Sequence, residues 1–329
     1  MSKNDSLMAM VPEPIRDGMV RFDEIFYESL NSVSPTLKKA IDLLKRGEGK
    51  RIRPLLLMLV GGSFAPITDQ LINGSVFIEM FHISTLIHDD VVDESYLRRG
   101  VPSMNAIFGN RKAILIGDYV LSSAMIQAMM TNNKEVVTQL ISLGKLLSEG
   151  EIFQMDVAEL GNFSEENYYK IVRRKTSSLI KASMQIGASL SGVEDEETKE
   201  SIGEAGELLG IAFQIRDDIF DFLPTKNLGK PAGQDVMEHK VTLPLIYALS
   251  DNDSEAEKVK KLLRHRDLKS KEINYIIDFT IRKGGIEYAE RIMKEKIDAA
   301  KEILTKVIPD GENKVAMLQI ADYIGYRKK

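Results

Sequence analysis

Two aspartates, Asp89 and Asp93, are the first residues along the chain whose types and spacing could support chemistry. They end an apolar stretch with helical periodicity that begins at Phe77. Residues four apart lie on one face of a helix, so both carboxylates would emerge together. Two carboxylates so close repel each other unless a cation lies between them. Mg²⁺ takes oxygen ligands and often shares them with a substrate phosphate, so the spacing predicts a magnesium site.

The same acidic pattern returns at Asp217, Asp218 and Asp221, again at the end of an apolar helical run. Asp90 is the matching middle carboxylate of the first motif. If the two helices face each other, their carboxylates could hold one diphosphate between bridging Mg²⁺ ions. Two solvated surface turns are the alternative, but a repeat of the same spacing favours a shared function.

Basic residues accompany the acidic motifs and suggest that anions bind beside the metal. Arginine forks and lysine ammonium groups are natural partners of phosphate. The spacing GxxxxGK[ST] of a nucleotide-binding P-loop is absent. Separate acidic and basic clusters indicate two diphosphates rather than one small anion. The basic residues are Lys50, Arg53, Arg98, Arg99, Arg173, Arg174, Lys175, Lys230 and Lys240.

The composition excludes several classes of protein. A net charge of −5 argues against nucleic-acid binding, and the lack of Cys excludes disulfides, thiolate metal sites and a cysteine nucleophile. The N-terminus has no signal-peptide or transit-peptide character, and no uninterrupted apolar run approaches the length of a membrane span. We therefore expect a cytoplasmic protein without a membrane-spanning segment.

The apolar residues follow a helical period along most of the chain, and no alternating strand pattern stands out. Residues 1–13 are expected to be loose, and residues 14–329 are expected to form a single all-α domain. The C-terminal residues from Gly325 onward are expected to lie in solvent. Helices are predicted at 14–30, 35–46, 52–60, 71–93, 110–130, 136–160, 198–221 and 241–249, and after Ser164.

Seven motifs occur in an order that resembles the trans-isoprenyl diphosphate (polyprenyl) synthases over nearly the whole chain. They are GKRIRP, HDDVVDESYLRRGVPSMN, Gly117-Asp118, RKTSSL, FQIRDDIFD, GKPAGQD and KVTLPL. The resemblance implies an all-α, isoprenoid-synthase-type helical bundle around a deep central cavity. It also implies a homodimer.

The reaction implied by the resemblance is head-to-tail prenyl transfer from an allylic diphosphate to isopentenyl diphosphate. Mg²⁺ on the allylic diphosphate would be held by Asp89, Asp90, Asp93, Asp217, Asp218 and Asp221. Arg98, Lys175, Lys230 and Lys240 would neutralise the leaving diphosphate, and Thr176 and Gln214 would line the region of the allylic cation. Isopentenyl diphosphate would be held by Lys50, Arg53, His82 and Arg99. No side-chain nucleophile is evident, and the resemblance implies that the departing diphosphate itself takes the proton.

Product length is predicted from the residues about one turn before Asp89. In short-chain members of the family a bulky aromatic residue there forms a floor, whereas Ser84 and Thr85 are small and Phe81 lies a further turn away. We therefore expect a long product, from hexaprenyl to decaprenyl, made from farnesyl or geranylgeranyl diphosphate, serving quinone side chains and released at a membrane surface. Replacement of Ser84 by Phe should shorten it.

Four alternatives stay open at the level of sequence. They are a short-chain farnesyl or geranylgeranyl diphosphate synthase, a terpene cyclase, a non-catalytic subunit of a heteromeric synthase, and a purely structural helical protein. A cyclase normally carries a second metal motif that is not all Asp, and it has no need of Lys50 and Arg53. A silent subunit usually loses one acidic motif, whereas both are present here. His82 is expected to contact ligand, and His88 to be structural.

Overall fold

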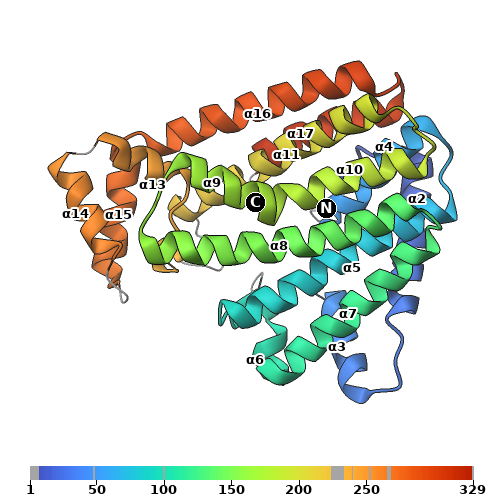
Figure 1. The fold of residues 1–329 in the computed structure, drawn as a ribbon, viewed down its shortest axis with the longest axis horizontal. Coiled ribbons are helices and arrows are strands. Elements are labelled where there is room, and N and C mark those ends of the chain that lie inside the picture. The colour runs from blue at the N-terminus through green and yellow to red at the C-terminus, as the bar shows by residue number, and fades with distance from the viewer. Residues whose placement is uncertain are drawn as a thin grey trace. The chain divides into compact units, whose positions relative to one another are not determined.

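The computed structural model describes residues 7–46, 49–98, 101–223, 233–238, 240–251, 253–264 and 268–327. Within these ranges the chain is helical except for turns and one short antiparallel pair of strands, so the predicted all-α class is confirmed (Figure 1). The strands are β1 (Leu97–Arg98) and β2 (Val101–Pro102), with Arg98 opposite Val101. This pair differs from the prediction of no strands, because two residues are too few to show an alternating pattern.

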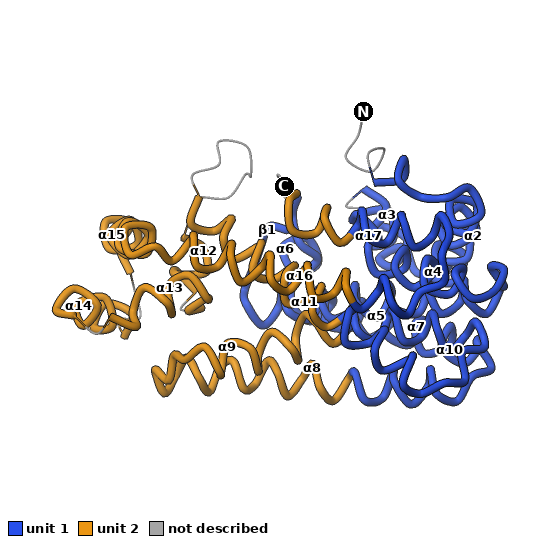
Figure 2. The backbone as a smooth tube through the Cα atoms, turned by 90° about the horizontal axis from the view of Figure 1, so that it is seen from above, with its two compact units in different colours: residues 1–143, 179–206, 303–320 blue, residues 144–178, 207–302, 321–329 orange. Residues whose placement is uncertain are grey.

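The chain forms two compact units, each built from separate stretches of sequence (Figure 2). Unit 1 comprises residues 1–143, 179–206 and 303–320, and unit 2 comprises residues 144–178, 207–302 and 321–329. Leu7 and Val11 are buried in unit 1, so the packed part of the chain begins before residue 14. The single domain spanning 14–329 and the central cavity stay predictions.

Unit 1 is organised around α5 (Asp69–Val92), which is buried on nearly all sides and packs on α7, α4 and α2. Thr68 caps its start by accepting a hydrogen bond from the Leu71 amide at 3.3 Å. The other complete helices of unit 1 are α2 (Glu13–Ser29), α3 (Pro35–Arg46), α4 (Ile52–Phe64), α6 (Met104–Phe108) and α7 (Asn110–Met130). The first acidic motif therefore ends a helix whose position is fixed by the core.

Unit 2 contains α9 (Glu165–Val172), which passes directly into a single π-helical turn, η1 (Arg173–Ser177). Ser164 caps α9 as predicted, accepting the Asn167 amide at 3.2 Å. The unit also contains α12 (Gln234–Met237), α13 (Leu243–Ala248), a 3₁₀ turn η2 (Leu249–Asp251), α14 (Ser254–Leu262) and α15 (Ser270–Arg282).

Several long helices have one part in each unit. They are α8 (Lys134–Leu160), α11 (Glu196–Phe222), α16 (Gly285–Val307) and α17 (Glu312–Tyr326), while α10 (Ser178–Leu190) lies in unit 1 from its second residue. Most helix positions agree with the sequence prediction to within a few residues, including both ends of α7. Strong periodicity and local caps explain that agreement.

By length and composition alone, α7 is the one helix in the described ranges that could cross a membrane, and 44% of its most apolar stretch is buried. Its sequence contains no uninterrupted apolar run of that length, because polar residues such as Asp118 interrupt it. A core helix of a soluble protein meets the same criteria.

Candidate active site

The first acidic motif keeps helical geometry to its last carboxylate. Asp93 follows α5 with right-handed helical angles, and its amide donates to the Asp89 carbonyl oxygen at 2.8 Å. The predicted one-turn spacing is therefore confirmed. Asp89 is half-buried and Asp93 is exposed. Both carboxylates thus reach the surface of unit 1 on one side of the helix end.

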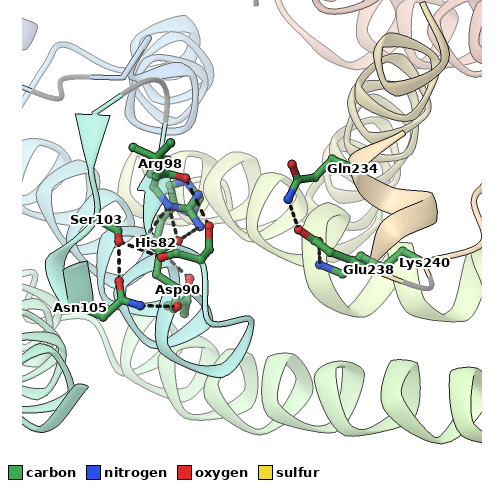
Figure 3. A network of polar contacts seen from close by, with 11 residues as sticks. His82, Asp90, Arg98, Ser103, Asn105, Gln234, Glu238 and Lys240 are labelled. Atoms are coloured by element: carbon green, nitrogen blue, oxygen red, sulfur yellow. Dashed lines mark hydrogen bonds and ion pairs between the residues drawn. The ribbon is translucent and has the colours of Figure 1, made fainter. Parts of the chain in front are cut away.

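Asp90 points into unit 1 and is an arginine partner in this structure. Its side chain is 4% exposed. Arg98 Nε donates to both carboxylate oxygens at 2.9 Å, and Nη2 donates to Oδ1 at 2.7 Å (Figure 3). The metal role predicted for Asp90 and the diphosphate role predicted for Arg98 would both require this forked pair to open or to act as a unit.

The segment after α5 is folded back to hold this pair in place. Asn105 Nδ2 donates to the Asp90 carbonyl oxygen at 2.9 Å, and Ser103 Oγ donates to the Ser95 carbonyl oxygen at 2.8 Å. Ser103 also bonds to the Asn105 side chain, as Figure 3 shows. The sequence analysis assigned no role to Ser103 or Asn105. Arg99, predicted to bind isopentenyl diphosphate, lies outside the described residues.

A cavity of about 290 Å³ lies in unit 1 beside this arginine–carboxylate pair. Its polar lining includes Arg51, His82, Asp90 and Arg98, and its apolar lining comes from α2, α3 and α5 and from residues 101–104. The structure thus brings the predicted substrate residue His82 to the same cavity as Arg98.

Arg51 was not assigned by the sequence analysis, although it stands between Lys50 and Arg53. Its backbone is left-handed, with φ of 52°. Its guanidinium lies 4.9 Å from the Phe22 ring centroid and 4.7 Å from that of Phe26, and it pairs with Asp23 at 3.1 Å. Arg51 therefore fixes the turn before α4. The position of this turn sets the directions in which the side chains of Lys50 and Arg53 extend.

His88 is structural, as predicted. Its Nε2 lies 3.2 Å from Asp118 Oδ1 and 3.3 Å from the Ile114 carbonyl oxygen on α7. A Cβ on Gly117 would come within 2.4 Å of the same ring nitrogen, so only glycine leaves room for the imidazole. The Gly117-Asp118 motif thus joins α7 to the end of α5.

The second motif shares with the first a buried middle aspartate. Asp218 is 1% exposed, and its carboxylate accepts the Tyr168 hydroxyl at 2.6 Å and Gln214 Nε2 at 2.8 Å. Burial raises the pKa of Asp218 to about 7, although both hydrogen bonds act to lower it. Burial, and then the charge of Asp218, raise the pKa of Tyr168 well above its ordinary value, so the hydroxyl stays a donor.

Thr176 and Gln214, predicted to act together, are in contact. Thr176 Oγ1 donates to Gln214 Oε1 at 2.7 Å, which extends the chain of hydrogen bonds from Tyr168 through Asp218. Thr176 lies in the π-helical turn η1, a type of irregularity that is frequent at functional sites. The neighbouring Lys175 pairs with Glu151 and donates to Gln154 Oε1 at 3.1 Å.

Gly210 allows the π-helical turn to pack closely against α11. A Cβ at this position would lie 2.5 Å from Ser177 Cα, closer than real contacts allow. This close approach of η1 to α11 brings Thr176 within hydrogen-bonding distance of Gln214, which also lies on α11.

Asp221 binds backbone amides on the far side of the loop that follows α11. Its carboxylate accepts the amides of Gln234 at 2.9 Å and Asp235 at 3.1 Å, so it caps the first turn of α12. Burial, and then the charge of Asp221, raise the pKa of Asp235 well above its ordinary value. The sequence analysis did not single out Asp235.

Lys240 lies beside α12, where Nζ pairs with Glu238 Oε2 at 2.9 Å and the backbone amide donates to the Asp235 carbonyl oxygen at 2.8 Å (Figure 3). Lys230, the other predicted lysine of this loop, lies outside the described residues.

Asp217 is the most exposed carboxylate of the second motif, at 46% of its side chain, and it pairs with Arg327 near the C-terminus. This contact corrects the expectation that the C-terminal residues lie in solvent. Neither Arg327 nor Tyr168 carried a sequence signal, because each lies far along the chain from the aspartate that it contacts.

The donor set suits a hard divalent cation. Among the described residues no group of three or more His, Asp or Glu side chains forms a ready-made metal cage. Asp89 and Asp93, and likewise Asp217 and Asp221, supply only carboxylate oxygens one helical turn apart. Mg²⁺ keeps several waters and completes its shell with substrate phosphates, so it fits such sparse sites.

Comparisons with known proteins agree with these observations. The polyprenyl synthetase family profile matches residues 34–280. The chain is 29% identical to octaprenyl diphosphate synthase of Haemophilus influenzae, with 98% of both proteins covered. It is 31% identical to short chain isoprenyl diphosphate synthase of Methanothermobacter thermautotrophicus, with 92% of this chain and 94% of that protein covered.

The fold is shared with a solved structure. Polyprenyl synthase of Caulobacter crescentus CB15, in complex with calcium and isoprenyl diphosphate, aligns with a TM-score of 0.91 at 27% identity, and 99% of this chain and 98% of that chain are covered. The profile spans most of the sequence, and the relatives match over nearly their full length. The chain therefore belongs to the polyprenyl synthetase family.

Proposed function

We propose that this protein is a Mg²⁺-dependent trans-prenyltransferase that condenses isopentenyl diphosphate head-to-tail with an allylic diphosphate. The observation that carries the proposal is the shared design of the two acidic motifs. In each, the second aspartate is buried and anchored, by Arg98 or by Tyr168 and Gln214, while carboxylates one turn apart flank it. Two carboxylate pairs with the same spacing suit one diphosphate that carries several metal ions.

The residues proposed to hold Mg²⁺ are chiefly Asp89, Asp93, Asp217 and Asp221, with Asp90 and Asp218 fixing the helix ends behind them. Bound Mg²⁺ would supply charge that stabilises a leaving diphosphate. The solved structure of the Caulobacter relative holds calcium and isoprenyl diphosphate, which supports the proposal of a divalent cation. Lys175, Lys230, Lys240 and Arg98 would add positive charge around the same diphosphate.

Isopentenyl diphosphate is proposed to bind through Lys50, Arg53, His82 and Arg99. Arg51 supports this assignment because it is fixed by the α2 aromatic rings and thereby orients the two flanking basic residues. The cavity beside His82 is largely apolar apart from its charged end, which suits a ligand with an anionic head and a hydrocarbon tail.

The remaining chemistry needs orientation and exclusion of water rather than a protein nucleophile. The Thr176 hydroxyl and the Gln214 amide would face the developing allylic cation, and their hydrogen bond keeps both in place. Holding the alkene of isopentenyl diphosphate against the allylic carbon supplies proximity. The released diphosphate would take the proton that ends each condensation.

We propose a long-chain product, from hexaprenyl to decaprenyl, grown from farnesyl or geranylgeranyl diphosphate for quinone side chains. Ser84 is buried and donates to the Phe81 carbonyl oxygen at 2.8 Å, whereas Thr85 is half-buried. Phe81 packs edge-on against Phe77, with 6.1 Å between ring centroids. Small side chains before Asp89 support a long product, and Thr85 is the more accessible place to test it.

We propose a homodimer that works in the cytoplasm and releases its product at a membrane surface. An exposed apolar face on α7 supports the dimer, since monomers rarely expose such stripes. It includes Leu115, Ile126, Met129 and Met130.

The first experiment is to incubate the pure protein with Mg²⁺, labelled isopentenyl diphosphate and farnesyl diphosphate, and to size the extracted prenyl alcohols. We expect long products that disappear with EDTA and with Asp89→Ala, but persist with Asp298→Ala on an exposed face of α16. Products that stop after one or two additions would agree with the proposed reaction but contradict the proposed long-chain product. A folded protein that incorporates nothing with any allylic primer would instead be a non-catalytic subunit.

A further inference from the structure

Arg327, close to the end of the sequence, is built into unit 2 rather than lying in solvent. Its side chain is 4% exposed and contacts the Asp217 carboxylate. The guanidinium carbon lies 3.8 Å from the Phe213 ring centroid, and Nη2 also lies 3.4 Å from the Phe213 carbonyl oxygen. Stacking, ion pair and backbone contact together fix the direction of this arginine.

Arg216 fixes the backbone of the same residue. Its Nε and Nη2 atoms donate to the Arg327 carbonyl oxygen at 3.3 and 3.1 Å. Arg216 is itself stacked on Phe220, 4.5 Å from the ring centroid, and its Nη1 lies 3.9 Å from Glu290 Oε1. Two consecutive residues of α11 thus hold Arg327, which directly follows α17. Arg216 binds the carbonyl oxygen of Arg327, and Asp217 binds its guanidinium.

The contact has a consequence for metal binding, because Asp217 is the exposed carboxylate of the second motif. A guanidinium on this carboxylate orients it and also repels an approaching divalent cation. A diphosphate brings negative charge of its own and offsets that repulsion. Metal alone and metal with diphosphate should therefore respond differently to Arg327.

Resting on the proposed function, we propose that Arg327 is a positioning residue for Asp217 that disfavours metal binding at the second motif until a diphosphate is present. Binding of the metal ion and binding of the diphosphate then become coupled, since Arg327 repels the cation alone more strongly than the cation bound to its diphosphate. Neither substrate nor metal contacts Arg327 directly in this scheme.

The test is a titration of the metal-free full-length protein with Mn²⁺, in which free Mn²⁺ is counted by electron paramagnetic resonance with and without inorganic pyrophosphate. Arg327→Gln should bind Mn²⁺ alone about tenfold more tightly than the unmodified protein, as expected for loss of one partly screened charge. With pyrophosphate the difference should fall below about threefold. Arg327→Lys, which keeps the charge, should stay close to the unmodified protein.

Arg291→Gln is the matched control, since Arg291 is an exposed arginine of unit 2 that pairs with Glu295. It should leave both titrations unchanged. No tighter binding by Arg327→Gln, or a gain that is equal with and without pyrophosphate, would overturn the inference and leave the proposed reaction intact. Absence of Mn²⁺ binding in every variant, even with pyrophosphate, would overturn both.

Discussion

At the scale of single residues, the buried middle aspartates separate structural from ligand-binding roles within one short motif. Asp90 and Asp218 each carry a carboxylate that is nearly inaccessible and hydrogen-bonded by the protein. Their neighbours on the same helix end are partly or fully exposed. Substitutions at buried and exposed positions of a motif should therefore affect stability and metal binding to different extents.

Arg98→Ala should lower the free energy of unfolding by about 2–3 kcal/mol, because it leaves the buried Asp90 carboxylate without its forked partner. Arg98 is partly exposed, so the loss should be smaller than for a fully buried pair. Urea denaturation measures it. The double variant with Asp90→Asn should recover part of the loss, whereas simple additivity of the two variants would contradict the pairing argument.

Tyr168→Phe should destabilise unit 2 by about 2 kcal/mol, because a buried carboxylate loses one of its two side-chain donors. That hydrogen bond lowers the pKa of Asp218, so its loss should raise this pKa further above about 7. The folded state then holds a proton that the unfolded state releases near pH 4, and stability falls with rising pH across that window. In the variant, this decrease in the free energy of unfolding should continue at pH values above 7.

Tyr275→Phe is the control for that variant. Its hydroxyl donates to Glu255 at 3.0 Å near the surface, so urea denaturation across pH should show a loss below about 1 kcal/mol and no extended window. Equal losses for the two tyrosines would count against the special role of Tyr168.

Candidate site residues that are marked by local spacing could be picked from the sequence. Residues that reach the site only through tertiary contacts could not. Asp89 and Asp93, or Thr176 within RKTSSL, follow from helical periodicity and motif order. Tyr168 and Arg327 contact Asp218 and Asp217 across long separations, and no local pattern marks them. The pairing of Asp90 with Arg98 could not be predicted from the sequence either, because it depends on the placement of the short strand β1 beside the end of α5.

At the scale of elements, the helices were predictable while the irregularities that position side chains were not. Caps and apolar periodicity placed α5, α7 and the start of α9 to within a few residues. The π-helical turn η1 adds one residue to a helical turn and leaves the periodicity nearly unchanged. It nevertheless carries Lys175 and Thr176, so a change in its packing should affect catalysis.

Gly210→Ala should lower the free energy of unfolding by about 1–3 kcal/mol and reduce kcat, because its Cβ would push Ser177 and with it Thr176. Gly144→Ala is the control of opposite sign. A Cβ there meets nothing within 4 Å, and alanine is favoured in a helix by about 0.5–1 kcal/mol. Thermal denaturation and steady-state kinetics on both variants test the argument; a loss of stability at Gly144 would contradict it.

Thr85→Phe should shorten the product by narrowing the space beside α5, with little change in the first condensation. Thr85 is a better site than Ser84, since the buried Ser84 has no room for a ring without overpacking. Chromatography of the prenyl alcohols measures the shift. An unchanged product distribution from a folded variant would contradict the prediction that side chains on α5 before Asp89 limit the product length.

At the scale of the whole molecule, membership of the polyprenyl synthetase family fixes the class of protein but not the product. Relatives of similar identity include an octaprenyl and a short chain synthase. The overall fold is therefore compatible with very different product lengths, and side chains on α5 rather than the arrangement of helices should decide between them.

Ile126→Glu with Met129→Glu should weaken the proposed dimer at least a hundredfold, because two charges would be buried in an apolar contact. Sedimentation velocity over a range of concentrations measures the change. Val315→Glu, at an exposed apolar residue of α17, should leave association unchanged. A dimer that survives both α7 substitutions would place the interface elsewhere.

The division of unit 1 among three stretches of sequence affects how the protein can fold during synthesis. Residues 303–320 complete the unit that contains α5, and they are synthesised long after it. Unit 1 is therefore complete only after the intervening stretches of unit 2 have been synthesised, although domains commonly fold from the N-terminus as they emerge. Nascent chains of this protein should depend on chaperones more than a chain whose N-terminal unit is continuous.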